Sequence, residues 1–167
     1  MALTYDPIAT TTISGSSTNT YTFSSIPSTY TDLVLAFANF QGTTNYSFAL
    51  RFNGDSGSNY SYTVLEGNGT SASSGTSTST TGYYNGAVIG FPDSKSSGMF
   101  SIMNYSNSTT YKTILGRYNY RGTGLSGMGI SVGTWRNTSA INSVTFFLAS
   151  GNFTAGSSAT LYGIKAA

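Results

Sequence analysis

Apolar and polar side chains alternate along short segments of this chain, and this period of two restricts it to β-structure. In Ile141–Leu148, for example, Val144, Phe146 and Leu148 fall on one face, which is the pattern of a half-buried strand. No window of about 11 residues repeats apolar side chains at the three- and four-residue spacing that a helix requires. Gly, Ser, Thr and Asn interrupt the chain too often for such a repeat.

The alternation predicts about eleven short strands, separated by turns rich in Gly, Asn and Ser. Glycine and asparagine tolerate positive φ, and short polar side chains bond to their own backbone. The strands are expected at Ile8–Ile13, Thr20–Phe23, Asp32–Phe40, Tyr46–Phe52, Tyr60–Leu65, Tyr83–Ile89, Met99–Tyr105, Tyr111–Tyr118, Gly129–Trp135, Ile141–Leu148 and Ala159–Ile164. Many short strands without helical crossovers predict an all-β, antiparallel β-sandwich, jelly-roll-like in form, with a closed barrel as the alternative.

The length of 167 residues predicts a single β-sandwich domain over 1–167, since no linker or fixed repeat divides the chain. One segment stands apart: Gly67–Gly82 contains no side chain larger than asparagine. It is expected to be a long exposed loop or hairpin. The simpler interpretation is a connection without a site, and the other is a displayed loop whose order depends on a neighbouring subunit.

Few side chains are charged: 7 Lys and Arg and 5 Asp and Glu give a net charge of +2. Without a basic run, the sequence predicts neither a nucleic-acid partner nor an anionic membrane surface. No apolar stretch approaches the roughly 18 residues of a membrane-spanning helix. The start, MALTYDPIAT, lacks the pattern of a secretory signal, so synthesis in a cytoplasm is expected.

The residues that usually carry out catalysis or bind metals are scarce. The chain has no His and no Cys, which removes the commonest general base and metal ligand. A serine hydrolase would have only a lysine as its base, and no segment resembling a nucleophile elbow accompanies the lysines. The carboxylates are scattered along the chain, at Asp6, Asp32, Asp55, Glu66 and Asp93. The turn Asn53–Asn59 has one carboxylate where a calcium loop uses several, so a plain hairpin turn is favoured. We expect no enzyme, no cofactor and no metal.

Tyrosines give the strongest signal outside the core. Tyr60 and Tyr62 share one sheet face, and Tyr118 and Tyr120 share another, followed by Arg121. Rows of Tyr and Arg suit a protein interface or a glycan contact. The alternative is that each ring closes the sandwich from inside and only its hydroxyl reaches solvent.

Several segments resemble a small β module of tailed bacteriophages of aquatic bacteria, cyanophages among them. The resemblance covers essentially the whole chain and is carried by Phe23–Leu35, Phe52–Ser61, Ile102–Thr113, Gly133–Val144 and Thr160–Lys165. Such modules occur in tail fibres, in receptor-binding parts and as small separate virion proteins. The resemblance carries over no catalytic residue. It implies a virion protein made in the cytoplasm of a host bacterium.

Within the virion, the absence of a shaft before the first strand favours a capsid decoration or cement protein, expected as a trimer. Its partners would be phage capsid or tail proteins. The alternative is a tail-fibre or receptor-binding module that recognises host surface glycans. Residues 1–7, with Leu3 and Tyr5, are a candidate anchoring arm that adds a strand to a neighbour's sheet, or else a frayed terminus.

Overall fold

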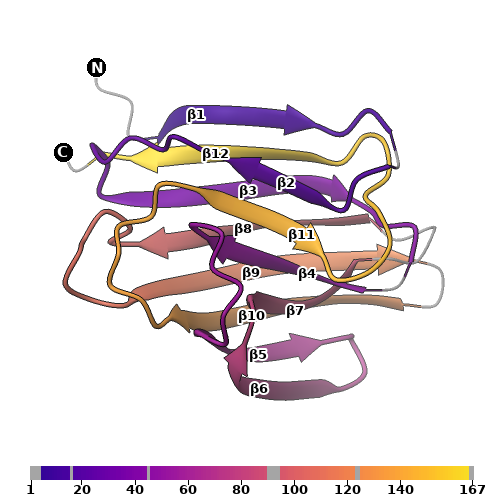
Figure 1. Cartoon of the computed structure of the whole chain (residues 1–167). Coiled ribbons are helices and arrows are strands. Elements are labelled where there is room, and N and C mark those ends of the chain that lie inside the picture. The colour runs from indigo at the N-terminus through magenta and orange to yellow at the C-terminus, as the bar shows by residue number, and fades with distance from the viewer. Residues whose placement is uncertain (1–4, 16, 45, 90–94, 123–124, 166–167) are drawn as a thin grey trace.

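The computed structural model describes residues 5–15, 17–44, 46–89, 95–122 and 125–165, in which twelve strands form two antiparallel sheets (Figure 1). The large sheet has the order β1-β12-β3-β8-β9-β10-β5-β6, and the small sheet has the order β2-β11-β4-β7. The strands are β1 (Tyr5–Thr12), β2 (Thr20–Phe23), β3 (Asp32–Phe40), β4 (Tyr46–Phe52), β5 (Tyr60–Gly67), β6 (Ala72–Thr80), β7 (Tyr83–Ile89), β8 (Lys95–Met103), β9 (Lys112–Gly122), β10 (Leu125–Trp135), β11 (Val144–Leu148) and β12 (Ser158–Ile164).

The predicted antiparallel β-sandwich is confirmed. The chain passes repeatedly from one sheet to the other, as at β3 to β4 and β11 to β12, which fits a jelly-roll-like connectivity. The sheets are unequal, with eight strands against four. The large sheet ends in two unpaired edges, β1 and β6, so the barrel alternative is wrong. The small sheet covers one face of the large one, and no other described strand covers the second face, which we call the open face.

Aromatic rings fill the space between the sheets. Phe40 in β3 is fully buried, and its ring centroid lies 5.0 Å from that of Phe37 and 5.2 Å from those of Phe48 and Phe153. Phe146 in β11 completes this group at 5.3 Å. Each such pair stabilises the fold by about 0.5–1.5 kcal/mol beyond the area it buries. The rings therefore join β3, β4 and β11 across the two layers.

The segment Gly67–Gly82 belongs to a hairpin, one of the two forms expected for it. It supplies the turn and the second arm, β6, and the first arm is β5. The turn is closed by Asn68, whose Oδ1 accepts hydrogen bonds from the backbone N–H groups of Thr70 at 2.9 Å and Ser71 at 2.8 Å. Gly69 has a φ of +86°, which favours glycine. The additional strand was not among the predicted ones because β6 has no apolar alternation.

Among the described residues, one charged side chain is fully buried. Lys112, at the start of β9, is fully buried, and its Nζ donates hydrogen bonds to the carbonyl oxygens of Thr110 at 2.8 Å and Thr138 at 3.0 Å. Burial lowers the pKa of this ammonium group, because desolvation disfavours the charged form. The contact ties the beginning of β9 to the segment that follows β10.

Candidate interaction surface

Strand β10 has small residues on the side that faces the small sheet. A Cβ atom at Gly129 would lie 2.4 Å from the hydroxyl oxygen of Tyr118, and one at Gly133 would lie 2.4 Å from the ring of Tyr83. Ser131, between them, is buried and lies 2.6 Å from the Tyr83 hydroxyl. Rings from neighbouring strands thus occupy the inner side of β10, and only small residues fit beneath them.

The apolar residues of β10 point the other way, onto the open face of the large sheet. Met128, Ile130 and Val132 are 65%, 51% and 47% exposed. Ile130 pairs with Leu65 of β5, and Val132 pairs with Leu115 of β9. These five exposed side chains form what we call the outer apolar patch. Contiguous exposed apolar surface is a common feature of interaction sites.

Two shallow hollows lie in the outer apolar patch. One, of about 320 Å³, is lined by Leu65, Leu115, Ile130 and Val132 together with neighbouring Thr and Ser side chains. The other, of about 280 Å³, lies between Leu65, Ile130 and Met128. Hollows of this size can accept apolar side chains from a partner surface, as the centres of protein interfaces do.

Cations border the patch on the side of β8 and β9. Arg117 pairs with Ile130 across β9 and β10, and Lys95 pairs with Arg121 across β8 and β9. All three cations are exposed. The nearby carboxylate of Glu66 turns to the opposite side of the sheet, where its Oε1 accepts a hydrogen bond from the Tyr118 hydroxyl at 2.7 Å. The border of the patch on the side of β8 and β9 is therefore positively charged.

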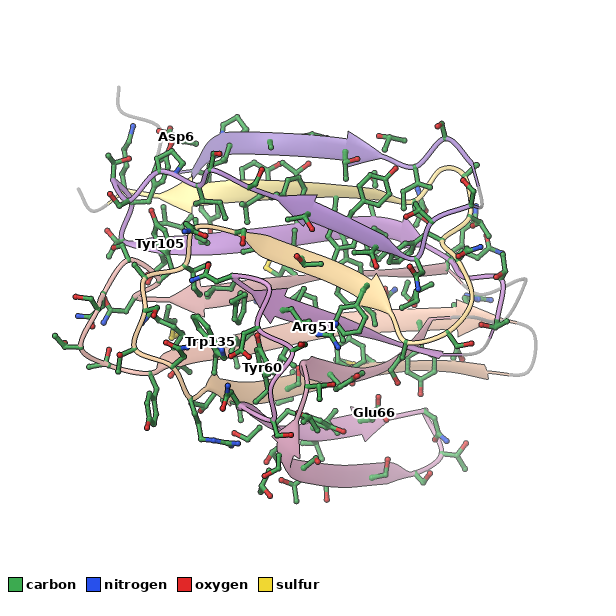
Figure 2. The ribbon with its side chains drawn as sticks, viewed as in Figure 1. Asp6, Arg51, Tyr60, Glu66, Tyr105 and Trp135 are labelled. Atoms are coloured by element: carbon green, nitrogen blue, oxygen red, sulfur yellow. The ribbon has the colours of Figure 1, made fainter. Side chains whose placement is uncertain are left out.

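Two of the tyrosines predicted to form an interface belong to the core instead. Tyr60 is fully buried and stacks on Trp135 with ring centroids 6.3 Å apart. Both residues are labelled in Figure 2. The Tyr60 hydroxyl accepts a hydrogen bond from the Phe52 N–H at 3.0 Å. Tyr118 is only 5% exposed. Burial raises the pKa of both phenols. The prediction of an exposed interface is wrong for these two residues, because their strand positions face the small sheet.

Tyr62 and Tyr120 are half-buried against the same core. The ring of Tyr62 lies 6.2 Å from that of Tyr84, and burial raises the pKa of Tyr120, with a further contribution from the charge of Glu66. Arg121 follows Tyr120 directly in β9 and points to the open face, since neighbours along a strand alternate. Tyr120 and Arg121 therefore do not share a face of the large sheet.

The candidate anchoring arm is in part a strand of this chain's own sheet. Tyr5 begins β1 and pairs with Ile164 of β12, and its ring meets that of Tyr162 edge-on at 6.1 Å. Tyr5 nevertheless remains 54% exposed. Leu3 lies outside the described residues. One edge of β1 is thus already paired with β12 of the same chain. That edge is not available for pairing with a strand of a neighbouring subunit.

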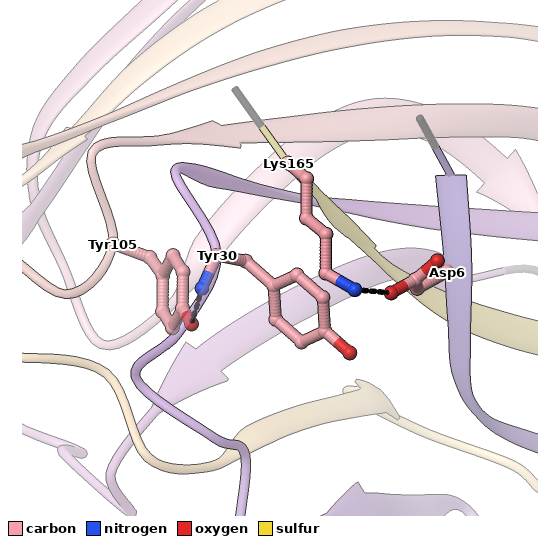
Figure 3. A network of polar contacts seen from close by, with 4 residues as sticks. All are labelled: Asp6, Tyr30, Tyr105 and Lys165. Carbon is pink, nitrogen blue, oxygen red and sulfur yellow. Dashed lines mark hydrogen bonds and ion pairs between the residues drawn. The ribbon is translucent and has the colours of Figure 1, made fainter. Parts of the chain in front are cut away.

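Four of the five carboxylates make separate structural contacts. Asp6 forms an ion pair with Lys165, which lies over the ring of Tyr30 (Figure 3). Asp32 accepts a hydrogen bond from the Asn104 N–H at 2.6 Å, Glu66 bonds Tyr118 as described, and Asp55 closes a turn. The fifth, Asp93, lies outside the described residues. Among the described residues no three His, Cys, Asp or Glu gather as metal ligands would.

Asp55 holds the turn Asn53–Asn59 together. Its carboxylate accepts hydrogen bonds from Trp135 Nε1 at 2.7 Å, from the Gly57 N–H at 2.8 Å and from Asn59 Nδ2 at 2.9 Å. Burial acts to raise the pKa of Asp55, but these donors outweigh it and the pKa lies below its ordinary value. Both oxygens of the Asp55 carboxylate therefore hold the turn to neighbouring groups.

Comparisons with protein-family models, with curated proteins and with solved structures gave no match. Among the described residues no helix is long and apolar enough to cross a membrane. The outer apolar patch was not anticipated from the sequence. Its signal is the alternation of Met128, Ile130 and Val132 with glycine and serine, beside a strand whose tyrosines point inward.

Proposed function

We propose that this chain is a non-enzymatic structural protein of a bacteriophage virion, attached to the particle through the outer apolar patch. The observation that carries the proposal is the patch itself: five large apolar side chains, each between 45% and 65% exposed, on a sheet face that the small sheet leaves open. That the particle is a phage virion is inferred from the resemblance of the chain to phage virion modules.

The chemistry of the side chains supports an assembly role over catalysis. The described carboxylates serve a turn, a strand end, a tyrosine and an ion pair at four separate places. None of these contacts pairs two carboxylates as a glycosidase does. With no His in the chain, a serine nucleophile would lack its usual base.

Of the stations on the virion, we propose the shell, as a decoration or cement protein. A shell protein is held by many repeated contacts, and apolar contacts depend less on salt than ion pairs do. A surface of hydroxyls with few charges suits such contacts. The tail-fibre or receptor-binding alternative draws on exposed Tyr and Arg side chains, and two of those tyrosines, Tyr60 and Tyr118, are buried.

Electron cryo-microscopy of particles that carry this protein tests the proposal. We expect density on the shell at symmetric junctions, with the outer apolar patch turned toward the shell. Density confined to the tail tip would favour receptor binding, and the next experiment would measure binding to host polysaccharide. Purified particles that lack the protein altogether would overturn the virion assignment.

Two methionines on the open face provide a matched pair of variants. Met128 lies in the outer apolar patch, whereas Met103 lies at the end of β8 and is 41% exposed. We expect Met128→Gln to lower occupancy on the particle by about tenfold, a loss of roughly 1.4 kcal/mol, and Met103→Gln to leave it unchanged. Equal occupancy for both variants would show that the patch is not the attachment surface.

A further inference from the structure

Strand β6 forms an edge of the large sheet, and the described part of the chain leaves it uncovered from Ala72 to Thr76. Beyond that stretch, Arg136 donates a hydrogen bond to the Thr78 carbonyl oxygen at 2.7 Å. Strand β6 pairs with β5 on one side only. From Ala72 to Thr76 every residue is exposed, and in the whole strand only Ser77 and Thr80 are partly buried. In Figure 1, the β5–β6 hairpin extends beyond the small sheet. A strand that buries so little within its own chain gains little from the core.

The opposite edge of the same sheet is protected in the ways that β-proteins use against pairing with other chains. Strand β1 contains Pro7, which cannot donate a hydrogen bond, and its register shifts between Pro7 and Ala9. It also carries the ion pair of Asp6 with Lys165 (Figure 3). Strand β6 has no proline and no charged residue. Its one register irregularity lies toward its end, opposite Tyr60 and Tyr62, so Ala72–Ser77 is regular.

The side chains of β6 are of the kind that this protein uses to pair strands. Threonine hydroxyls bond across neighbouring strands at Thr10 with Thr160 (3.0 Å) and at Thr22 with Thr145 (2.9 Å). The third such pair, at 3.2 Å, joins Thr76 of β6 to β5. Cross-strand pairs of this type stabilise sheets. A second strand of Ser and Thr beside β6 would extend the same pattern.

We propose that β6 pairs antiparallel with β6 of a second copy of this chain, so that the two large sheets become one. The residue types fit a two-fold axis at Gly75. Such an axis places Ser74 opposite Thr76 of the second copy and Ser73 opposite Ser77. Every opposed residue is small and uncharged, so no like charges meet across the joint. Because each copy presents the same edge, the contact closes on itself as a dimer.

This dimer goes beyond the proposed virion role and does not depend on it. The trimer expected from the resemblance would need a second surface that relates the copies by three-fold rotation. Sedimentation velocity of the purified chain over a range of concentrations separates the two cases. We expect a monomer–dimer equilibrium. A monomer at all concentrations, or a trimer without a dimer, would overturn the proposal.

Lysine substitutions test whether β6 forms the contact. In Ser74→Lys with Thr76→Lys, four cations surround the proposed axis, and we expect the dimer to weaken by at least about tenfold. The matched control places the same charges on the other edge, as Thr10→Lys with Thr12→Lys, and should leave the dimer intact. Circular dichroism checks that both proteins fold. If only the control dissociates, the contact lies at β1 and the proposal fails.

Cysteine cross-linking tests the register and also works if the lysine variant does not fold. The chain has no cysteine of its own, so any disulfide that forms must involve the introduced cysteines. Across a two-fold axis only the axial residue faces its own counterpart, so Gly75→Cys should form a disulfide dimer. A mixture of Ser74→Cys with Thr76→Cys should cross-link into a heterodimer. A maximum elsewhere within 73–77 would move the axis, and no cross-link at any of these positions would disprove the pairing.

Discussion

Strand β10 has two faces that differ in an unexpected way. Toward the small sheet it has Gly129, Ser131 and Gly133, and toward solvent it has large apolar side chains. The inner side is nevertheless the buried one, because tyrosine rings from β7 and β9 fill it. Whether a residue of this protein is buried thus depends on the side chains that neighbouring strands place over it, and not only on its own polarity.

The same comparison separates stability from association. The inner face holds the two sheets together through packing, and its substitutions should act on the free energy of unfolding. The outer apolar patch contributes less to the fold, since about half of each side chain is in solvent, and its substitutions should act on contacts with other molecules. Four experiments test this division, from the largest expected effect to the smallest.

Removing an aromatic ring from the inner face should lower the free energy of unfolding more than any other change proposed here. Tyr83 is fully buried and meets Phe100 edge-on at 5.8 Å. Tyr83→Ala leaves a cavity and is expected to lower the free energy of unfolding by about 4 kcal/mol, measured by urea denaturation with the fluorescence of Trp135. Tyr83→Phe keeps the ring and should cost only about 1 kcal/mol. Similar losses for both would contradict the role of the ring.

Adding a methyl group at Gly133, beneath the Tyr83 ring, should lower the free energy of unfolding by nearly as much. A Cβ at Gly133 would lie 2.4 Å from the Tyr83 ring and 2.5 Å from the Ser61 carbonyl oxygen, and the backbone cannot easily retreat. Gly133→Ala is expected to lose about 3 kcal/mol of unfolding free energy. Gly67→Ala is the control, since nothing lies within 4 Å of its added Cβ. Equal midpoints in urea would refute the close packing.

Alkaline pH should lower the free energy of unfolding, because the buried tyrosines of the inner face resist ionisation. Burial raises the pKa of Tyr60, Tyr83 and Tyr118 above the ordinary 10.0. Below about pH 10 both states are neutral and stability is constant. Above it the unfolded chain ionises first, so each tyrosine lowers the unfolding free energy by about 1.4 kcal/mol per pH unit until it ionises in the folded state.

Urea midpoints measured from pH 8 upward would follow this decline, and Tyr118→Phe should make it shallower. Tyr111→Phe, which removes a hydroxyl from a side chain 56% exposed, is the matched control. A decline as steep in Tyr118→Phe as in the unmodified chain would show that this phenol is not held neutral by the fold.

The smallest effect on stability is expected on the outer apolar patch. Ile130→Thr keeps a β-branched side chain in a strand and should change the unfolding free energy by about 0.5 kcal/mol or less, while attachment to the particle weakens. The same change on the inner side of β9, Ile114→Thr, affects a fully buried residue and should lose about 2 kcal/mol. Comparable losses would mean that the patch is part of the core.

Alternation along the chain was enough to predict most of the fold. It located Asp32–Phe40 and Tyr46–Phe52 at the bounds of β3 and β4, because apolar residues in those strands do face the core. It failed at β6, where hydroxyls and backbone hydrogen bonds hold the strand without apolar contacts. Pairing with a neighbour depends on residues far away in the sequence, and a local pattern does not contain it.

The candidate site was predicted less well for a related reason. Both faces of β5 and β9 carry apolar or aromatic residues, as Val64 beside Leu65 and Ile114 beside Leu115 illustrate. Period two alone does not say which of the two is buried. Only the position of the small sheet, set by long-range pairing, assigns Tyr60 and Tyr118 to the core and leaves the neighbouring leucines exposed.

The buried ammonium group of Lys112 has a consequence for where this fold can persist. It fastens the start of β9 to the segment after β10 through two carbonyl oxygens, a task that small β-domains often assign to a disulfide. A chain with no cysteine has no disulfide whose reduction could destabilise it. Thiol reductants and mild disulfide-forming oxidants should therefore leave its thermal unfolding midpoint unchanged.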